Sequence, residues 1–333
     1  MTARPMEPLA PDASAPVEVD GGSWMRLMRR GRWAEAWELS DAGIRSLAGA
    51  PCWHLPRHQQ HVWDGAPVAG RRVLVRCYHG LGDTLQFIRF AAPLRARARE
   101  VTVWAQDALI PLLATVSGID RLLPLHDGTP EVEYDVDVEV MELAHVLRAT
   151  PETVGSAVPY LHVAPAPIAR DHRLQVGIAW ECGDWERDKR SVPFASLAPL
   201  AAVSGVALHV IQRGPGLAAR DPSFGTLSGS DDVLQAARLV RALDLVITID
   251  SMPAHLAGAL GVPVWTLLPH DADWRWMDDR GDSPWYPTMR LFRQPAPGAW
   301  APLVARVATA LGQDAAQHAV HHLESRAVRG TSL

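Results

Sequence analysis

The sequence predicts an α/β protein in which two doubly wound parallel sheets face each other across a cleft. Two observations lead to this prediction. Strand and helix patterns alternate in both halves of the 333-residue chain, and each half contains an apolar strand that runs through a tight turn directly into a helix. A proline-rich segment at 150–172 separates the halves, as expected of a linker between two domains of ordinary size.

The first 66 residues precede the alternating pattern. We expect a disordered leader at 1–22, which is rich in proline and alanine and has no helical periodicity. At 23–66, tryptophans and aliphatic residues on either side of Gly31 predict two short helices, followed by an irregular bridge. Such a pair is similar to one tetratricopeptide-type unit, but a stable solenoid needs about three repeats. We therefore interpret it as a helical cap packed on the next domain.

The first predicted domain, 67–165, opens with the most informative stretch of the chain. A strand at 73–77 runs into a turn that contains Gly80 and Gly82, and a helix follows from Asp83. The two glycines permit backbone angles that other residues resist, and they permit close approach to the main chain. Ligands of such sheets bind beyond the carboxyl ends of the strands, so Asp83 is the first candidate functional residue.

The remaining elements are predicted from periodicity. In the first domain we expect strands at 101–105, 120–125 and 132–140 and a helix at 107–116; the acids that alternate along the last strand are expected to face solvent. In the second domain, 166–312, we expect strands at 174–180, 206–212, 245–249 and 262–268 and helical segments at 191–203 and 231–243. Ser230 or Asp231 is the expected N-cap of the latter helix, and 313–333 is expected to be a frayed helical tail.

The second domain has its own strand, turn and helix around Ser251 and Met252. Pro253 suits the first turn of the helix, whose backbone N–H groups and positive dipole end form a site for an anion such as a diphosphate. His255 lies in the same turn, where it either donates a further hydrogen bond or is merely packed.

Three other residues of this domain are candidates for the cleft. Arg190, in the loop DWERDKRSVP, is placed to stabilise a departing phosphate. Trp180 and Trp274 both follow strands that end at the cleft, where an aromatic face stacks on a sugar or a nucleobase.

Composition excludes several classes. The net charge of −5 and the lack of a long basic run argue against nucleic-acid binding. Three widely spaced cysteines fit neither a disulfide framework nor a zinc site, and no run of 18 apolar residues is present, so we expect a soluble cytoplasmic protein without a transmembrane segment. The motifs of dinucleotide-dependent oxidoreductases, P-loop proteins and serine hydrolases are absent from the sequence.

Four motifs follow one another along the chain: HGLGDTLQFIRFAAPL, KRSVPFASLAPL, IDSMPAHLAGALGVPVWTLLP and DWRWMDDRGDSPWYPTMRLFRQ. Together, over roughly 63–311, they resemble glycosyltransferase family 9, the heptosyltransferase-like enzymes, and most of all the branch often fused to tetratricopeptide repeats. The resemblance implies a GT-B fold, in which the N-terminal Rossmann-like domain holds the acceptor and the C-terminal one holds a nucleotide-sugar.

On the acceptor side, the resemblance implies that Asp83 is the general base, although capping its own helix is a competing role. His79 stands where the tetratricopeptide-fused relatives usually carry a glutamine. With Gly80, Gly82 and Gln86 it makes up the expected acceptor or cleft side of the site.

On the donor side, the basic residue ahead of the proline, Arg190, is expected to hold the donor phosphates. The family segment D-[ST]-x-x-x-H matches Asp250, Ser251 and His255. The resemblance implies that backbone groups of Ser251 and Met252 contact the diphosphate.

The reaction implied is a single inverting displacement that requires neither a metal nor another cofactor. A nucleotide-diphosphate sugar, such as one like ADP-heptose, would be the donor, and a hydroxyl of a glycan or protein would be the acceptor, with peripheral membrane contact compatible with this chemistry. The alternative is a non-catalytic GT-B-fold binding or scaffold protein.

Overall fold

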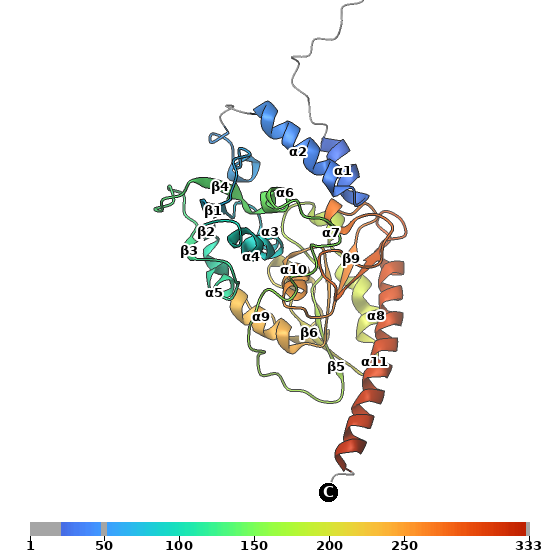
Figure 1. The fold of residues 1–333 in the computed structure, drawn as a ribbon. Helices are drawn as coiled ribbons and strands as arrows, with labels where there is room; N and C mark the ends of the chain where they lie inside the picture. Colours follow the sequence, from blue (N-terminus) through green and yellow to red (C-terminus); the bar gives the residue numbers. More distant parts are fainter. Residues whose placement is uncertain (1–20, 48–51, 331–333) are drawn as a thin grey trace, which may run out of the picture.

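The computed structural model describes residues 21–47 and 52–330, and within them the strands form one four-stranded and one six-stranded sheet (Figure 1). The first sheet has the order β3-β2-β1-β4 and the second β10-β9-β8-β5-β6-β7, and every pairing between these strands is parallel. The strands are β1 (Arg72–Arg76), β2 (Glu100–Ala105), β3 (Arg121–Pro124), β4 (Val136–Glu139), β5 (Leu174–Ile178), β6 (Val206–Val210), β7 (Thr226–Leu227), β8 (Leu245–Ile249), β9 (Val264–Leu268) and β10 (Met289–Arg293).

In each sheet the chain winds outward in both directions from its first strand. β1 lies between β2 and β4, and β5 lies between β6 and β8. The predicted pair of doubly wound parallel sheets is therefore confirmed. Crevices at which the strand order reverses are where such sheets bind ligands.

Short helices connect the strands. The α-helices are α1 (Gly21–Arg29), α2 (Trp33–Leu47), α3 (Leu81–Phe87), α4 (Ala91–Arg95), α5 (Ile110–Leu113), α6 (Leu143–Val146), α7 (Arg187–Arg190), α8 (Ala198–Ala201), α9 (Val233–Ala242), α10 (Met252–Ala259) and α11 (Trp300–Gly330). α3 and α10 pack against each other between the two sheets, whereas α11 runs along the outside of the second domain beside α8 (Figure 1). The two domains therefore meet through α3, which follows the first strand of the first domain, and α10, which follows the fourth strand of the second.

Two local predictions need correction. β4 starts only at Val136, and Glu139 at its end is buried rather than solvated, with its carboxylate accepting hydrogen bonds from the backbone N–H groups of Tyr78 and Met141. The N-cap of α9 is Asp232, not Ser230 or Asp231, since its carboxylate accepts hydrogen bonds from the N–H groups of Leu234 and Gln235. The predicted helical tail is the last part of α11, which runs to Gly330.

The predicted helical cap is present and contacts both domains. α1 and α2 meet at Gly31, which has a φ of +73°. The ring of Trp33 lies 5.1 Å from that of Trp285 in the second domain, and the indole N–H of Trp37 donates to the carbonyl of Ala149 in the first. The cap therefore spans the junction between domains. Of the predicted leader, only residues 21 and 22 lie within the described residues, and both belong to α1.

Candidate active site

A cavity of about 750 Å³ lies where α3 of the first domain faces α10 of the second. We call it the central cavity. All the predicted site residues except Trp180 and Gln86 line it: His79, Gly80, Gly82, Asp83, Arg190, Asp250, Ser251, Met252 and His255. The structure thus brings together motifs from two domains that are separated by more than a hundred residues in the sequence.

Asp83 has two partners at the start of α3. Its Oδ2 accepts a hydrogen bond from the backbone N–H of Gly80 at 3.1 Å, which caps the helix. Its Oδ1 accepts from Nη2 of Arg275 at 2.7 Å. Asp83 therefore does cap its own helix, and 27% of its side chain remains exposed toward the cavity. The role as general base stays a prediction.

Arg275 is a site residue that sequence reasoning missed. It comes from the second domain and is nearly buried, and its guanidinium donates hydrogen bonds to side-chain oxygens of three residues. Besides Asp83, its Nη1 donates to Asp273 at 2.9 Å and its Nε donates to Oε1 of Gln86 at 2.9 Å. The one available signal was its place in the last family-like motif, DWRW.

Gln86 therefore has a different role from the one predicted. Its side chain is fully buried and does not line the central cavity, because it turns along α3 toward Arg275. It accepts a hydrogen bond from the guanidinium of Arg275 and so holds that group in position.

The glycine turn is explained by packing. Gly80 has a φ of −68° and Gly82 lies within α3, so neither uses the left-handed angles that the sequence suggested. A Cβ on Gly82 would lie 3.1 Å from Cδ2 of His255 and 3.4 Å from Cα of Met252. Gly82 allows α3 and α10 to touch, so the close approach to the main chain that this glycine permits is made by another helix of the same chain.

The start of α10 faces the cavity as predicted. Ser251 is its N-cap and makes no side-chain capping bond, and Pro253 lies in the first turn. The hydroxyl of Ser251 donates instead to the carbonyl of Ile249 at 3.3 Å. The N–H groups and positive dipole end of this turn favour an anion.

Arg190 lies beside this helix start. Its Nη1 is 3.7 Å from Oδ2 of Asp250, and its buried Nε has no hydrogen-bond partner among the described residues. Burial, together with the nearby carboxylate of Asp273, raises the pKa of Asp250. A cation with donor capacity to spare next to a helix start is suited to phosphate oxygens.

Three histidines line the central cavity, His58, His79 and His255, and the two that the sequence predicted lie there in different ways. His255 is buried, its Nδ1 lies 3.0 Å from the hydroxyl of Tyr286, and burial holds its pKa well below the usual value, so it is a neutral, packed ring. His79 is partly exposed and lies 3.7 Å from Oε2 of Glu139. Burial lowers the pKa of His79 and raises that of Glu139 to about 8.

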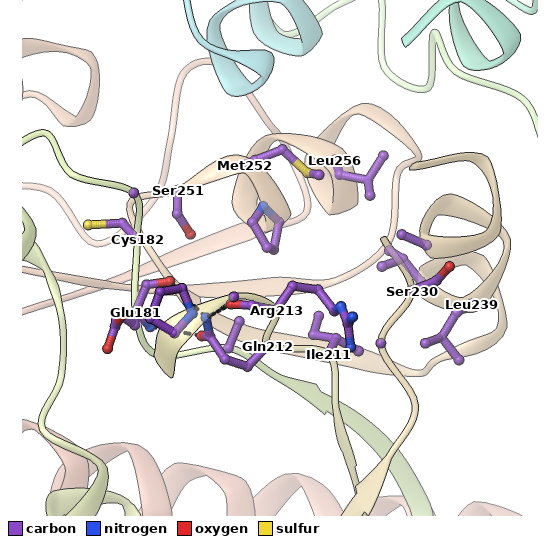
Figure 2. A pocket seen from close by; sticks show the side chains of 18 of the residues that line it. Glu181, Cys182, Ile211, Gln212, Arg213, Ser230, Leu239, Ser251, Met252 and Leu256 are labelled. Atoms are coloured by element: carbon purple, nitrogen blue, oxygen red, sulfur yellow. Dashed lines mark hydrogen bonds between the residues drawn. The ribbon is translucent and has the colours of Figure 1, made fainter. Parts of the chain in front are cut away.

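A second cavity of about 360 Å³ lies entirely in the second domain, beyond the carboxyl ends of β5, β6 and β8 (Figure 2). Ile211, Leu239 and Leu256 give it an apolar wall. Polar groups converge on its other side, where Gln212 accepts from the backbone N–H of Glu181 at 2.9 Å. The sequence did not predict this cavity. Ser251 and Met252 line both cavities, so the two meet at the start of α10.

The prediction for Trp180 is wrong. Only 2% of its side chain is exposed, it lines neither cavity, and its ring lies 5.1 Å from Phe194 and 6.3 Å from Phe224 in the core. The side chain points to the opposite side of the chain from Ala179 and Glu181, which line the second cavity. Trp274, in contrast, lines the central cavity, as the sequence suggested.

Comparison with known proteins agrees with this architecture. No protein-family model matches the chain. Protein FlbA of Caulobacter vibrioides is 27% identical over 340 residues, which cover 87% of this chain and 54% of FlbA, so the chain spans about half the length of this curated relative.

Among solved structures, E. coli ADP-heptose LPS heptosyltransferase II matches with a TM-score of 0.53 and 15% identity, over 73% of this chain and 99% of that one. The chain has the GT-B fold of this heptosyltransferase. The iron-containing dodecameric glycosyltransferase TibC of E. coli matches with a TM-score of 0.50 and 14% identity, over 78% of each chain. The predicted resemblance to family 9 is thus confirmed for the fold. In the described part of the chain, no helix has the length and apolarity needed to cross a membrane.

Proposed function

We propose that this chain is a glycosyltransferase that moves a sugar from a nucleotide-diphosphate sugar to a hydroxyl group of a glycan or protein in the cytoplasm. One observation carries the proposal: Asp83 of one domain and the start of α10, with Arg190, in the other line the same central cavity. A carboxylate opposite an anion site is what a displacement at a sugar bonded to a diphosphate requires.

The two cavities suggest how the donor is held. The nucleoside would occupy the second cavity, whose apolar wall suits a base. The diphosphate would lie over Ser251 and Met252, because these residues line both cavities. The sugar would then project into the central cavity, toward Asp83.

The proposed reaction is a single inverting displacement without a metal or another cofactor. The acceptor oxygen forms a bond to the anomeric carbon while Asp83 takes the proton of the acceptor hydroxyl. The bond from that carbon to the diphosphate oxygen breaks, and the nucleoside diphosphate leaves with the electron pair, stabilised by Arg190 and the helix start. Loss of one such stabilising group typically costs about a hundred- to a thousandfold in rate.

A thermal-shift panel of ADP, UDP, GDP and dTDP, each also as a sugar adduct, tests the proposal on wild type and on Arg190→Ala. A ligand at about a hundred times its Kd adds roughly 2.7 kcal/mol of apparent stability. We expect a shift with one nucleotide that Arg190→Ala abolishes. Lys189→Ala is the matched control, because Lys189 lies in the same short helix and pairs with Glu186 and Asp271.

The absence of a shift with every nucleotide would contradict the proposal. The alternative of a non-catalytic GT-B-fold scaffold would then be favoured, and the capping and ion-pair contacts of Asp83 would be its purely structural role.

A further inference from the structure

Trp185 is the most exposed large apolar side chain among the described residues, with 62% of its surface accessible. It also lines the central cavity. An indole offers a large apolar face, and leaving it in water forgoes the free energy that burial would give. At the mouth of a cavity, a ligand covers such a face.

The position of Trp185 is held by its neighbours. It lies between β5 and α7, and the next residue, Glu186, has a φ of +49°, a left-handed angle that is strained for a residue with a Cβ. Its ring lies against Arg190, whose guanidinium carbon is 4.9 Å from the ring centroid. The ion pair between Lys189 of α7 and Asp271, at 3.7 Å, is exposed to solvent and contributes little to the position of this helix.

The contact with Arg190 places the ring close to the anion site. Nη1 of Arg190 lies 3.7 Å from Oδ2 of Asp250, and the residues after Asp250, Ser251 and Met252, form the start of α10. The guanidinium of Arg190 therefore lies between the indole and the position expected for the diphosphate. Trp185 lines the central cavity but not the second cavity, so a base bound in the second cavity would not reach it.

We propose that Trp185 provides the aromatic face that covers the transferred sugar of the donor. This inference rests on the proposed function. The C–H face of a sugar ring stacks on the indole, while Arg190 holds the adjoining phosphate. Trp185 is thus a specificity-determining residue for the sugar and contributes little to binding of the nucleoside diphosphate alone.

The test measures, by isothermal titration calorimetry, Kd for two ligands on each variant. The ligands are the nucleoside diphosphate that shifts the wild type and its hexose adduct (ADP-glucose, UDP-glucose, GDP-mannose or dTDP-glucose). For Trp185→Ala we expect a roughly tenfold weaker Kd for the adduct, which corresponds to about 1.4 kcal/mol. The Kd of the diphosphate alone should stay within about twofold, and Trp185→Phe should retain most of the affinity for the adduct.

Trp53→Ala is the matched control. Trp53 is 57% exposed and also stacks on an arginine, Arg76, at 5.3 Å, but it does not line either cavity. Unchanged adduct affinity in Trp185→Ala, or an equal loss for both ligands, overturns the role of Trp185 and leaves the proposed function standing. If neither ligand binds the wild type, the proposed function fails and this inference fails with it.

Discussion

Replacing Arg275 by methionine is expected to destabilise the protein strongly, because this guanidinium joins the two domains. It contacts Asp83 at 2.7 Å, Asp273 at 2.9 Å and Gln86 at 2.9 Å. Methionine keeps an apolar stem that can pack on the ring of Trp274, from which the guanidinium carbon is 4.9 Å. The substitution thus removes mainly the charge and its hydrogen bonds.

The magnitude follows from burial. The side chains of Arg275 and Asp273 are each only 10% exposed and that of Asp83 is 27% exposed. Removing one partner of a buried ion pair leaves the other charge without compensation and costs about 3–5 kcal/mol. Since Asp83 can regain some water from the cavity, we expect the lower part of this range, about 3 kcal/mol.

Equilibrium unfolding in urea, followed by circular dichroism, measures this loss. Arg280→Met is the control, because Arg280 pairs with Asp282, which is 70% exposed, and such a surface pair contributes at most about 1 kcal/mol. In an Arg275→Met background, Asp83→Asn should cost less than it does alone, since the two residues are coupled. A loss for Arg275→Met as small as that for Arg280→Met would refute the reasoning.

Two further predictions concern pH and access. Burial raises the pKa of Glu139 from 4.5 to about 8, so the folded protein retains a proton that the unfolded chain releases; stability should fall as pH rises from about 4.5 to about 8, and Glu139→Gln should flatten this part of the Tm profile. If the slope of the Tm profile is unchanged in Glu139→Gln, the pH dependence arises from another group, for example Glu142, whose burial raises its pKa to about 7. Cys182 lines the second cavity, so a maleimide should label it and bound nucleotide should slow the labelling, with Cys182→Ser as the blank. Labelling of Cys77, which is fully buried, or labelling that nucleotide leaves unchanged, would contradict this placement.

The elements that sequence predicted best are those whose signal is local. Apolar runs followed by glycine or proline predicted β1 with α3 and β8 with α10, because the strand, the turn and the helix start are encoded within about twenty residues. Each motif therefore placed its own residues at the carboxyl end of a strand. Parallel topology placed each of them at the carboxyl edge of its own sheet, and the way the two domains face each other brought both edges to one cavity.

The contacts of Arg275 were not predictable in the same way. Its bond to Asp83 joins residues 192 positions apart and depends on how the two domains are oriented. No local periodicity encodes that orientation. The same limit applies to Glu139, which alternation assigned to a solvated face but whose carboxylate is buried and accepts hydrogen bonds from the backbone N–H groups of Tyr78 and Met141.

The tryptophans show where a pattern stops being informative. Trp180 continues the two-residue alternation of β5, because it packs in the same core as Val176 and Ile178, so its ring turns into the core although the residue follows the end of the strand. Five residues later, the ring of Trp185 is exposed at the cavity, and the residue after it, Glu186, has a left-handed backbone angle. Both are tryptophans after the same strand; alternation accounts for the buried ring of Trp180, whereas the exposed ring of Trp185 depends on the three-dimensional path of the loop.

The contact at Gly82 links the two halves of the candidate site. Because a Cβ there would lie 3.1 Å from His255 and 3.4 Å from Met252, the absence of a side chain sets how closely α3 approaches α10. Asp83 is the next residue on α3, and Met252 is the first residue of α10. One helix contact thus limits how closely the carboxylate of Asp83 and the start of α10 approach each other.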